Sequence, residues 1–194
     1  LIYITFTYNL ISVKQTMYRT QNQSTEKPME KQYREMVHTR RLYKFEGDFF
    51  ELPSYRYMNV QLNITTVRNI AKVIWSIENN TPYMIPDIRF GKGLYHGTAK
   101  GKKYYYSWCN GQTIELAPTQ RDILTLIHEI VHALGYDYHD SRFVGKYIEL
   151  LHKYAGIPKK ELIMGMQKYK VSLPTKYRKK HTRTAAKRSH KKKK

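Results

Sequence analysis

The chain has 194 residues, of which 41% are apolar, and a formal net charge of +20. This length fits one domain with tails, and the apolar fraction is large enough to form a core. The single cysteine, Cys109, excludes an intrachain disulfide and a zinc site built from several cysteines, and it fits an intracellular, reducing compartment.

The charge is distributed unevenly along the chain. No acidic residue follows Glu161, and residues 162–194 hold 13 of the 35 Lys and Arg residues. The first 161 residues hold the other 22, together with all 15 acidic residues. We therefore expect a mildly basic folded part and a strongly basic tail.

The chain opens with a short apolar stretch, residues 1–11. It has no basic segment before it and no small-residue cleavage site after it, so it is a poor signal peptide. No stretch reaches the roughly 18–20 apolar residues of a membrane span, and we expect no membrane association. Residues 14–30 are polar and predict a linker. Residues 1–28 are either an added strand with a linker or an upstream stretch outside the functional protein.

The first part of the domain is expected to contain helices. Residues 30–45 have weak helical spacing, and residues 55–64 predict a strand or an extended lead-in. Residues 66–79 predict a better helix, capped by Thr65 or Thr66. Its apolar stripe repeats at helical spacing through Val67, Ile70, Ala71, Ile74 and Ile77, and Trp75 is expected in the core.

A β-rich region follows. Residues 84–90 and the aromatic run 102–109 predict strands. Asn110-Gly111 is a strong hairpin signal, and residues 112–117 alternate as the returning strand. The run Tyr104–Trp108 follows two lysines, so it either stacks on nucleic-acid bases or places alternate side chains in the core.

Three helices are expected after the hairpin. The first begins near Pro118-Thr119, where Thr119 and Asp122 resemble a capping box, and it ends at Gly135. The second runs from about Ser141, a good N-cap residue, to Tyr154, and a third spans residues 159–168.

The first of these helices carries the pattern H-E-x-x-H as His128, Glu129 and His132. Two histidines four residues apart are rotated by only about 40° on a helix, so both imidazoles leave the same face and can bind one metal ion. Glu129 lies about 100° from His128, where its carboxylate can reach a water molecule without being a ligand. The surrounding residues are strongly apolar, a setting in which polar side chains without a role are costly. This arrangement predicts a zinc hydrolase, whereas the alternative is an amphipathic helix with surface or core histidines.

A zinc hydrolase needs a third protein ligand and one open position. His139 is the best candidate, because Gly135 lets the chain turn back and a short loop can then bring His139 to the metal. Asp137 or Asp140 would instead make a set of two histidines and one carboxylate, and Glu149 is a weaker candidate.

These residues resemble the SprT-like zinc metallopeptidases, in which H-E-x-x-H is followed by a variable loop and a third histidine in an H-G-x-x-F-like context. Here that context is His139 to Phe143, and Gly111-x-x-Ile114-x-Leu116 resembles the strand before the catalytic helix. The resemblance covers about residues 65–155. Asp140 replaces the usual glycine, and the loop is short. Metzincins, another zincin group, place the third histidine six residues after the second. Tyr138 occupies that position here, and His139 lies one residue beyond it.

The hypothesis for the mechanism is a Zn²⁺ ion on His128, His132 and His139, with Glu129 as the general base. Tyr136 or Tyr138 is a candidate oxyanion donor. The expected substrate is a protein or peptide, whose backbone would pair with residues 112–117 as an edge strand.

The basic tail is expected to be disordered and to bind DNA or RNA through phosphates, without sequence preference. The candidate contacts are Lys179, Lys180, Arg183, Lys187 and Arg188. The alternatives are a nuclear-type address and a solubilising role. A peptidase held on nucleic acid would meet other bound proteins at high effective concentration. Such nucleic-acid-associated proteins fit the substrates that the resemblance to SprT-like peptidases implies.

Together these expectations describe an α+β protein with a zincin-like domain at residues 31–170. It lies between an N-terminal extension, residues 1–30, and a basic tail, residues 171–194. A small antiparallel or mixed sheet packs on the H-E-x-x-H helix, and a further helix follows. Two other functions stay open: a nucleic-acid-binding or structural protein with a non-catalytic metal site, and a zinc amidase that acts on another polymer.

Overall fold

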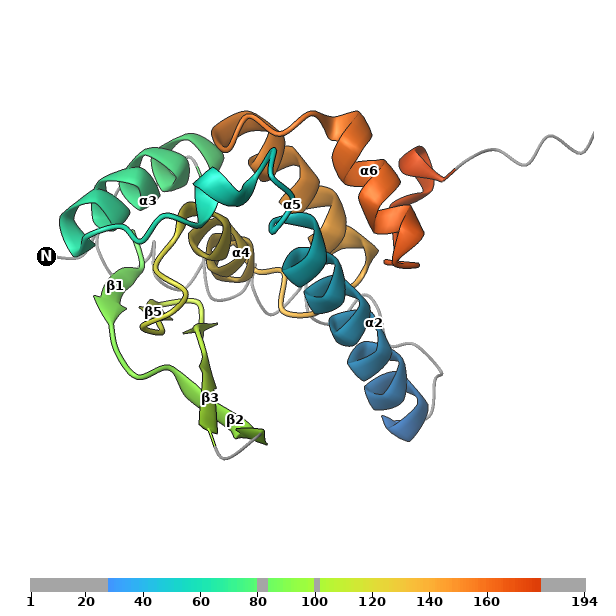
Figure 1. Cartoon of the computed structure of the whole chain (residues 1–194), viewed down its shortest axis with the longest axis horizontal. Coiled ribbons are helices and arrows are strands. Elements are labelled where there is room, and N and C mark those ends of the chain that lie inside the picture. Colours follow the sequence, from blue (N-terminus) through green and yellow to red (C-terminus); the bar gives the residue numbers. More distant parts are fainter. Residues whose placement is uncertain (1–27, 80–83, 100–101, 179–194) are drawn as a thin grey trace, which may run out of the picture. The chain divides into compact units, whose positions relative to one another are not determined.

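The computed structural model describes residues 28–79, 84–99 and 102–178 (Figure 1). These residues form helices and a small mixed sheet, which confirms the predicted α+β class. The α-helices are α2 (Pro28–Phe49), α3 (Ile64–Glu78), α4 (Ile123–Ala133), α5 (Ser141–Tyr154) and α6 (Lys159–Lys168). The strands are β1 (Asp87–Phe90), β2 (Leu94–Ala99), β3 (Lys102–Tyr106), β4 (Trp108–Cys109) and β5 (Thr113–Leu116). Two short 3-10 helices are η1 (Arg56–Asn59) and η2 (Thr175–Tyr177).

The chain divides into two compact units, residues 1–34 and 35–194. Of the first unit, the structure describes only the beginning of α2. All contacts reported below lie within the second unit. In the described part of the chain, no helix is both long enough and apolar enough to cross a membrane.

Helix α2 is longer than the weak spacing of residues 30–45 predicts. Its C-terminal half buries Leu42, Phe45 and Phe49, which follow one another at helical spacing. Of the two predictions for residues 55–64, the strand is wrong, because short-range backbone bonds such as Met58 N to Tyr55 O form η1 there. Residues 60–63 form neither helix nor strand and lead into α3, with extended backbone at Val60.

Helix α3 buries Val67, Ala71, Ile74 and Trp75, so the predicted core position of Trp75 is confirmed. Its N-cap is Asn63, whose side chain accepts a hydrogen bond from Thr66 N at 2.9 Å, and not Thr65 or Thr66. Asn63 directly precedes Ile64, the first helical residue, and so occupies the N-cap position, whereas Thr65 and Thr66 lie inside the first turn.

The main sheet has the strand order β1-β5-β4, with β1 parallel and β4 antiparallel to β5. Strand β5 is therefore central, and the prediction that residues 112–117 form an edge strand open to a substrate is wrong. The predicted hairpin at Asn110-Gly111 is confirmed. Its Asn110 side chain accepts hydrogen bonds from the backbone at Gln112 and Thr113, and Gly111 has a φ of +88°.

The aromatic run at residues 102–109 forms two strands instead of one. Ser107 interrupts it, because its backbone N–H donates to the Gln120 side chain at 2.7 Å and its hydroxyl accepts from Ala117 N at 3.0 Å. Strand β3 then pairs with β2 in a separate two-stranded sheet, and β4 joins the main sheet.

Helix α4 packs against α3, α5 and the strands β4 and β5, so it occupies the middle of the second unit (Figure 1). Its N-cap is Asp122, which accepts from Leu124 N and Thr125 N at 3.0 and 2.9 Å. The predicted cap at Thr119 is wrong, because Asp122 is adjacent to the first helical residue and Thr119 is three positions too early.

Gly135 ends α4 as predicted. It has a φ of +92°, and the bonds Gly135 N to His132 O and Tyr136 N to Val131 O form a Schellman motif. Helix α5 then begins at Ser141, but its cap is Asp140, which accepts from Arg142 N and Phe143 N.

Helices α5 and α6 have the predicted bounds, residues 141–154 and 159–168. The packed part continues past the predicted boundary at residue 170, because Val171 and Leu173 are buried in the core. The residues predicted to contact nucleic acid, Lys179 to Arg188, lie outside the described residues, so that contact stays a prediction.

Candidate metal centre

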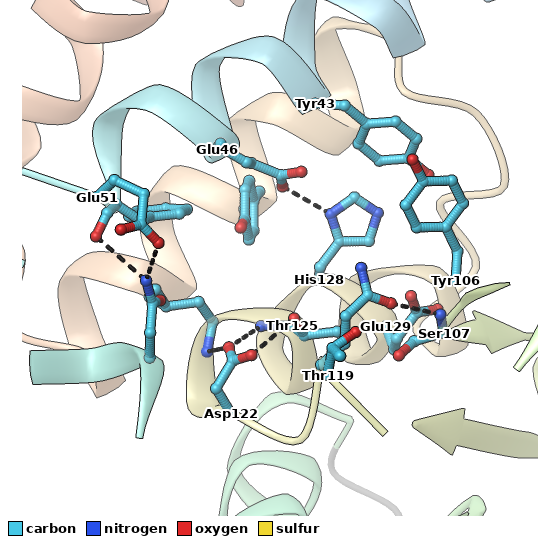
Figure 2. A pocket seen from close by; sticks show the side chains of 16 residues that line it. Tyr43, Glu46, Glu51, Tyr106, Ser107, Thr119, Asp122, Thr125, His128 and Glu129 are labelled. Atoms are coloured by element: carbon cyan, nitrogen blue, oxygen red, sulfur yellow. Dashed lines mark hydrogen bonds and ion pairs between the residues drawn. The ribbon is translucent and has the colours of Figure 1, made fainter. Parts of the chain in front are cut away.

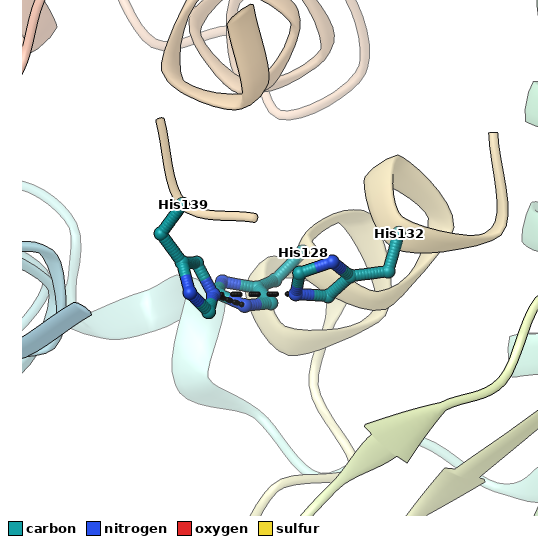
Figure 3. A group of neighbouring side chains, drawn as sticks. All are labelled: His128, His132 and His139. Atoms are coloured by element: carbon teal, nitrogen blue, oxygen red, sulfur yellow. Dashed lines mark hydrogen bonds between the residues drawn. The ribbon is translucent and has the colours of Figure 1, made fainter. Parts of the chain in front are cut away.

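The three histidines singled out in the sequence converge on one point (Figure 3). His139 Nε2 lies 3.0 Å from His128 Nε2 and 3.2 Å from His132 Nε2. One ring nitrogen from each residue lies within 4.8 Å of the others. In the described part of the chain, this is the one group of His, Cys, Asp and Glu side chains that can hold a metal ion.

Local structure accounts for this convergence. His128 and His132 lie one turn apart on α4, and the reversal at Gly135 directs the following loop back toward that turn. The carboxylate alternatives for the third position do not join the cluster. Asp137 is exposed, Asp140 caps α5, and Glu149 binds Lys176 at 2.8 Å.

Each imidazole also contacts a polar partner through its Nδ1 atom, on the side away from the point of convergence. His128 Nδ1 lies 2.8 Å from Glu46 Oε1, and His132 Nδ1 lies 2.8 Å from the Tyr136 carbonyl oxygen. His139 Nδ1 lies 3.1 Å from Thr39 Oγ1. Such outer partners fix the tautomer and the orientation of a metal-binding histidine.

These partners leave too few protons for the inner nitrogens. A carbonyl oxygen and an ionised carboxylate can only accept hydrogen bonds, so His132 and His128, in the neutral form that binds a metal ion, carry their protons on Nδ1 and lone pairs on Nε2. His139 Nε2 can donate a proton to at most one of them. At least one contact therefore sets two lone pairs against each other, and a bound cation would resolve this repulsion.

The spacing also fits zinc. Two nitrogens that each lie about 2.0–2.1 Å from a tetrahedral zinc ion are about 3.3–3.4 Å apart. The two shorter separations here, 3.0 and 3.2 Å, need only a small expansion to match. The residues present thus fit a metal ion of this kind.

Burial keeps two of the histidines ready to bind a cation. It lowers the pKa of His132 to about 4 and that of His139 to about 2, with a further contribution from the neighbouring histidines. Both are neutral at pH 7, which is the ligating form. For His128, burial opposes protonation, but the Glu46 carboxylate outweighs it and raises the pKa.

An aromatic side chain supports the cluster. Phe143 is fully buried on α5, and its ring centroid lies 5.0, 4.7 and 4.8 Å from those of His128, His132 and His139. Phe143 is also the last residue of the His139 to Phe143 motif, so the motif combines a candidate ligand with the residue that packs against all three rings.

Glu129 lies beside this cluster and lines a cavity of about 430 Å³ (Figure 2). The cavity lies between α2, η1 and the first half of α4, and His128 is also in its wall. Glu129 is only 5% exposed. Burial raises its pKa to about 7, a rise that His128 reduces and Glu46 reinforces. A carboxyl group with this pKa can take up and release a proton near neutral pH.

The tyrosines predicted as oxyanion donors do not line this cavity. Tyr136 packs partly against the core and uses its carbonyl to hold His132, and Tyr138 is exposed on the same loop. The tyrosines that line the cavity are Tyr43, Tyr106 and Tyr147. Tyr147 is buried and shares a hydrogen bond with Glu46, and burial, followed by the charge of Glu46, raises its pKa.

Sequence reasoning missed the contribution of α2 to this site. The contacts from this helix span long stretches of sequence: Glu46 lies 82 positions before His128, and Thr39 lies 100 positions before His139. A signal was present in the helical spacing, since Thr39, Tyr43 and Glu46 follow at intervals of four and three and therefore share one face of α2.

We expect Glu46→Gln to weaken zinc binding about 10-fold and Glu46→Ala about 100-fold, the range typical of outer partners of metal ligands. Glutamine keeps an acceptor oxygen behind His128 but removes the negative charge, whereas alanine removes both the charge and the acceptor. Competition with a chromogenic chelator measures the affinity.

The matched control for this prediction is Glu51→Gln. Glu51 also lines the cavity, but it contacts Asn59 and Arg56 and not a histidine. Its affinity should stay within about twofold of wild type. Equal affinities for Glu46→Ala and wild type would show that Glu46 does not support the metal site.

Comparison of the chain with protein-family models, with curated proteins and with solved structures found no match. The case for a function therefore depends on the geometry and chemistry of the site itself.

Proposed function

We propose that the protein is a zinc-dependent metallopeptidase with a zincin-like domain of the kind that the SprT-like resemblance implies. The observation that carries the proposal is one juxtaposition: three histidines converge on one point, and the buried Glu129 beside them lines a cavity. His128, His132 and His139 would hold the metal ion, and Glu129 would be the general base.

Zinc is the metal that this donor set favours. Three neutral imidazoles are typical ligands of catalytic zinc, and the described residues add no carboxylate or sulfur to the cluster. When bound, zinc lowers the pKa of a water molecule to about 7 and polarises a substrate carbonyl.

Glu129 would move the protons of the reaction. In its ionised form it takes a proton from the attacking water, and in its protonated form it gives that proton to the leaving amine. Its pKa of about 7 makes both forms accessible at neutral pH, and its burial keeps bulk water from competing for the proton. Glu46 and Thr39 would hold His128 and His139 in position during this step.

The number of candidate ligands favours catalysis over a purely structural role. Structural zinc sites are usually closed by four protein ligands, whereas catalytic sites use three and keep one position for water or substrate. In the described residues the cluster has three members. The cavity beside His128 and Glu129 provides space for a substrate.

A substrate panel tests the proposal. The purified full chain, loaded with one equivalent of zinc, should cleave casein, lose this activity with a chelator and regain it with added zinc. The same preparation should leave a cell-wall polymer with amide cross-links intact. Cleavage of that polymer with intact casein would instead support the amidase. If neither is cleaved by zinc-loaded protein, the metal site is structural.

A further inference from the structure

This inference rests on the proposed function, which so far assigns no residue to stabilise the charge on the substrate carbonyl oxygen. Peptide hydrolysis places negative charge on the carbonyl oxygen, and preorganised hydrogen-bond donors that face this oxygen commonly provide a large part of the rate enhancement. A phenol is a suitable donor, because its ordinary pKa near 10 keeps it protonated at neutral pH. The question is which tyrosine lies where such a donor is needed.

Tyr43 on α2 is a cavity-lining tyrosine whose ring packs against two of the candidate ligand histidines, His128 and His139. Its ring centroid lies 5.8 Å from that of His128 and 5.4 Å from that of His139, with its ring edge-on to His139. It lines the same cavity as Glu129. Tyr43 therefore borders the metal site and the cavity together.

Tyr106, the last residue of β3, packs beside Tyr43. The two ring centroids are 5.9 Å apart with an interplanar angle of 30°. Figure 2 shows Tyr43 and Tyr106 next to each other, and both residues line the same cavity as His128 and Glu129. The contact joins α2 to the β2–β3 hairpin next to the metal site and restricts the orientation of the Tyr43 ring.

The third tyrosine of the cavity is already engaged. Tyr147 is 1% exposed and its hydroxyl bonds to Glu46, which in turn holds His128. Redirecting that hydroxyl toward a substrate would leave the Glu46 carboxylate without one of its partners. Tyr147 is thus a supporting residue.

We propose that Tyr43 is a further catalytic residue, whose phenol donates a hydrogen bond to the substrate carbonyl oxygen as that oxygen gains charge. Tyr106 is a positioning residue that holds the Tyr43 ring through their contact. No proton leaves Tyr43 in this step, because its hydroxyl donates a hydrogen bond and stays intact. The N-terminal helix α2 thereby supplies the active site with a donor in addition to the outer partners Thr39 and Glu46.

The test compares peptide hydrolysis by zinc-loaded wild type, Tyr43→Phe and Tyr57→Phe. Phenylalanine keeps the ring that packs on His128 and His139 and removes only the hydroxyl. We expect kcat to fall about 100-fold in Tyr43→Phe with KM within about twofold, since the donor acts on the charged oxygen and not on the ground state. Zinc content should equal that of wild type. Tyr57 is 67% exposed and does not line the cavity, so its variant should keep full activity.

A second readout does not depend on turnover. A phosphinic peptide, whose tetrahedral oxygens resemble the charged intermediate, should bind Tyr43→Phe about 100-fold more weakly than wild type by calorimetry. Tyr106→Phe keeps the ring contact and should change this affinity less than about fivefold, whereas Tyr106→Ala removes the contact and should weaken it more.

Three results would overturn the inference: full or increased activity in Tyr43→Phe, unchanged affinity for the phosphinic peptide, or a loss that follows Tyr136→Phe or Tyr138→Phe instead. These outcomes are separable from failure of the proposed function. If wild-type protein loaded with zinc cleaves no peptide and Glu129→Gln behaves identically, the peptidase proposal and this inference fail together. If wild type is active, only the behaviour of Tyr43→Phe decides.

Discussion

Glu129→Gln is expected to abolish peptide hydrolysis while the metal stays bound. The glutamine amide has nearly the same shape as the carboxyl group but cannot take up a proton, so the attacking water and the leaving amine both lose their proton carrier. General acid–base groups typically contribute 10²- to 10⁴-fold, and we expect a loss of roughly 10³-fold or more in kcat. Casein hydrolysis, followed together with zinc content, measures the effect.

The matched control is Glu30→Gln, which makes the same chemical change at an exposed position near the start of α2. Its activity should equal that of wild type. A Glu129→Gln variant that holds one zinc and keeps wild-type kcat would show that Glu129 does not carry the proton. A variant that loses its zinc would instead show that Glu129 supports the metal site.

His139→Ala is expected to abolish the stabilisation of the fold that we predict for zinc binding. A ligand present at about 1,000 times its Kd stabilises the native state by about 4 kcal/mol, which corresponds to a rise in Tm of roughly 10 °C for a domain of this size. The Nε2 atom of His139 lies 3.0 Å from that of His128 and 3.2 Å from that of His132, so it joins the two other candidate ligands. Without it, two ligands remain and zinc should no longer raise the Tm measurably.

Thermal unfolding with excess zinc and with a chelator measures this difference for each variant. The control is His152→Ala, because His152 lies on α5 and its Nδ1 binds the Ile157 carbonyl at 2.9 Å, outside the cluster. That variant should keep the full zinc-dependent rise in Tm, even if its overall stability falls. The same rise in His139→Ala and wild type would exclude His139 as a ligand.

The parts of this site that depend on local spacing could be predicted from the sequence. His128 and His132 share a helix face because they are four residues apart, and Gly135 marks the end of the helix through its conformational freedom. These two features also make His139 the best candidate for the third position. The structure brings these three histidines together and leaves Asp137 and Asp140 outside the cluster.

The features that depend on distant contacts could not be predicted. Glu46 and Thr39 lie 82 and 100 positions from the histidines they contact, and no local pattern pairs residues so far apart. The order of the strands also depends on contacts between residues that are far apart in the sequence. Alternation in residues 112–117 predicts a strand, but only the parallel pairing with β1, more than 20 residues earlier, makes β5 central.

Helix caps show a third kind of limit. Several neighbouring residues offered acceptor side chains, and the choice between them depended on where the first helical turn forms. At α4, Asp122 accepts two backbone hydrogen bonds and Thr119 lies too far from them. At α5, Asp140 takes the role predicted for Ser141. The helices were thus predictable to within a few residues, whereas their N-caps were not.

The central claim is that His128, His132 and His139 bind one metal ion and leave a position open beside Glu129. A crystal structure of the zinc-loaded full chain, with anomalous data collected at the zinc absorption edge, tests it most directly. We predict one zinc ion with three imidazole Nε2 ligands at about 2.0–2.1 Å, with Glu129 near its open side and not coordinated. A zinc ion bound by Asp137 or Asp140 in place of His139, a fourth protein ligand that closes the site, or the absence of zinc from the three histidines would contradict it.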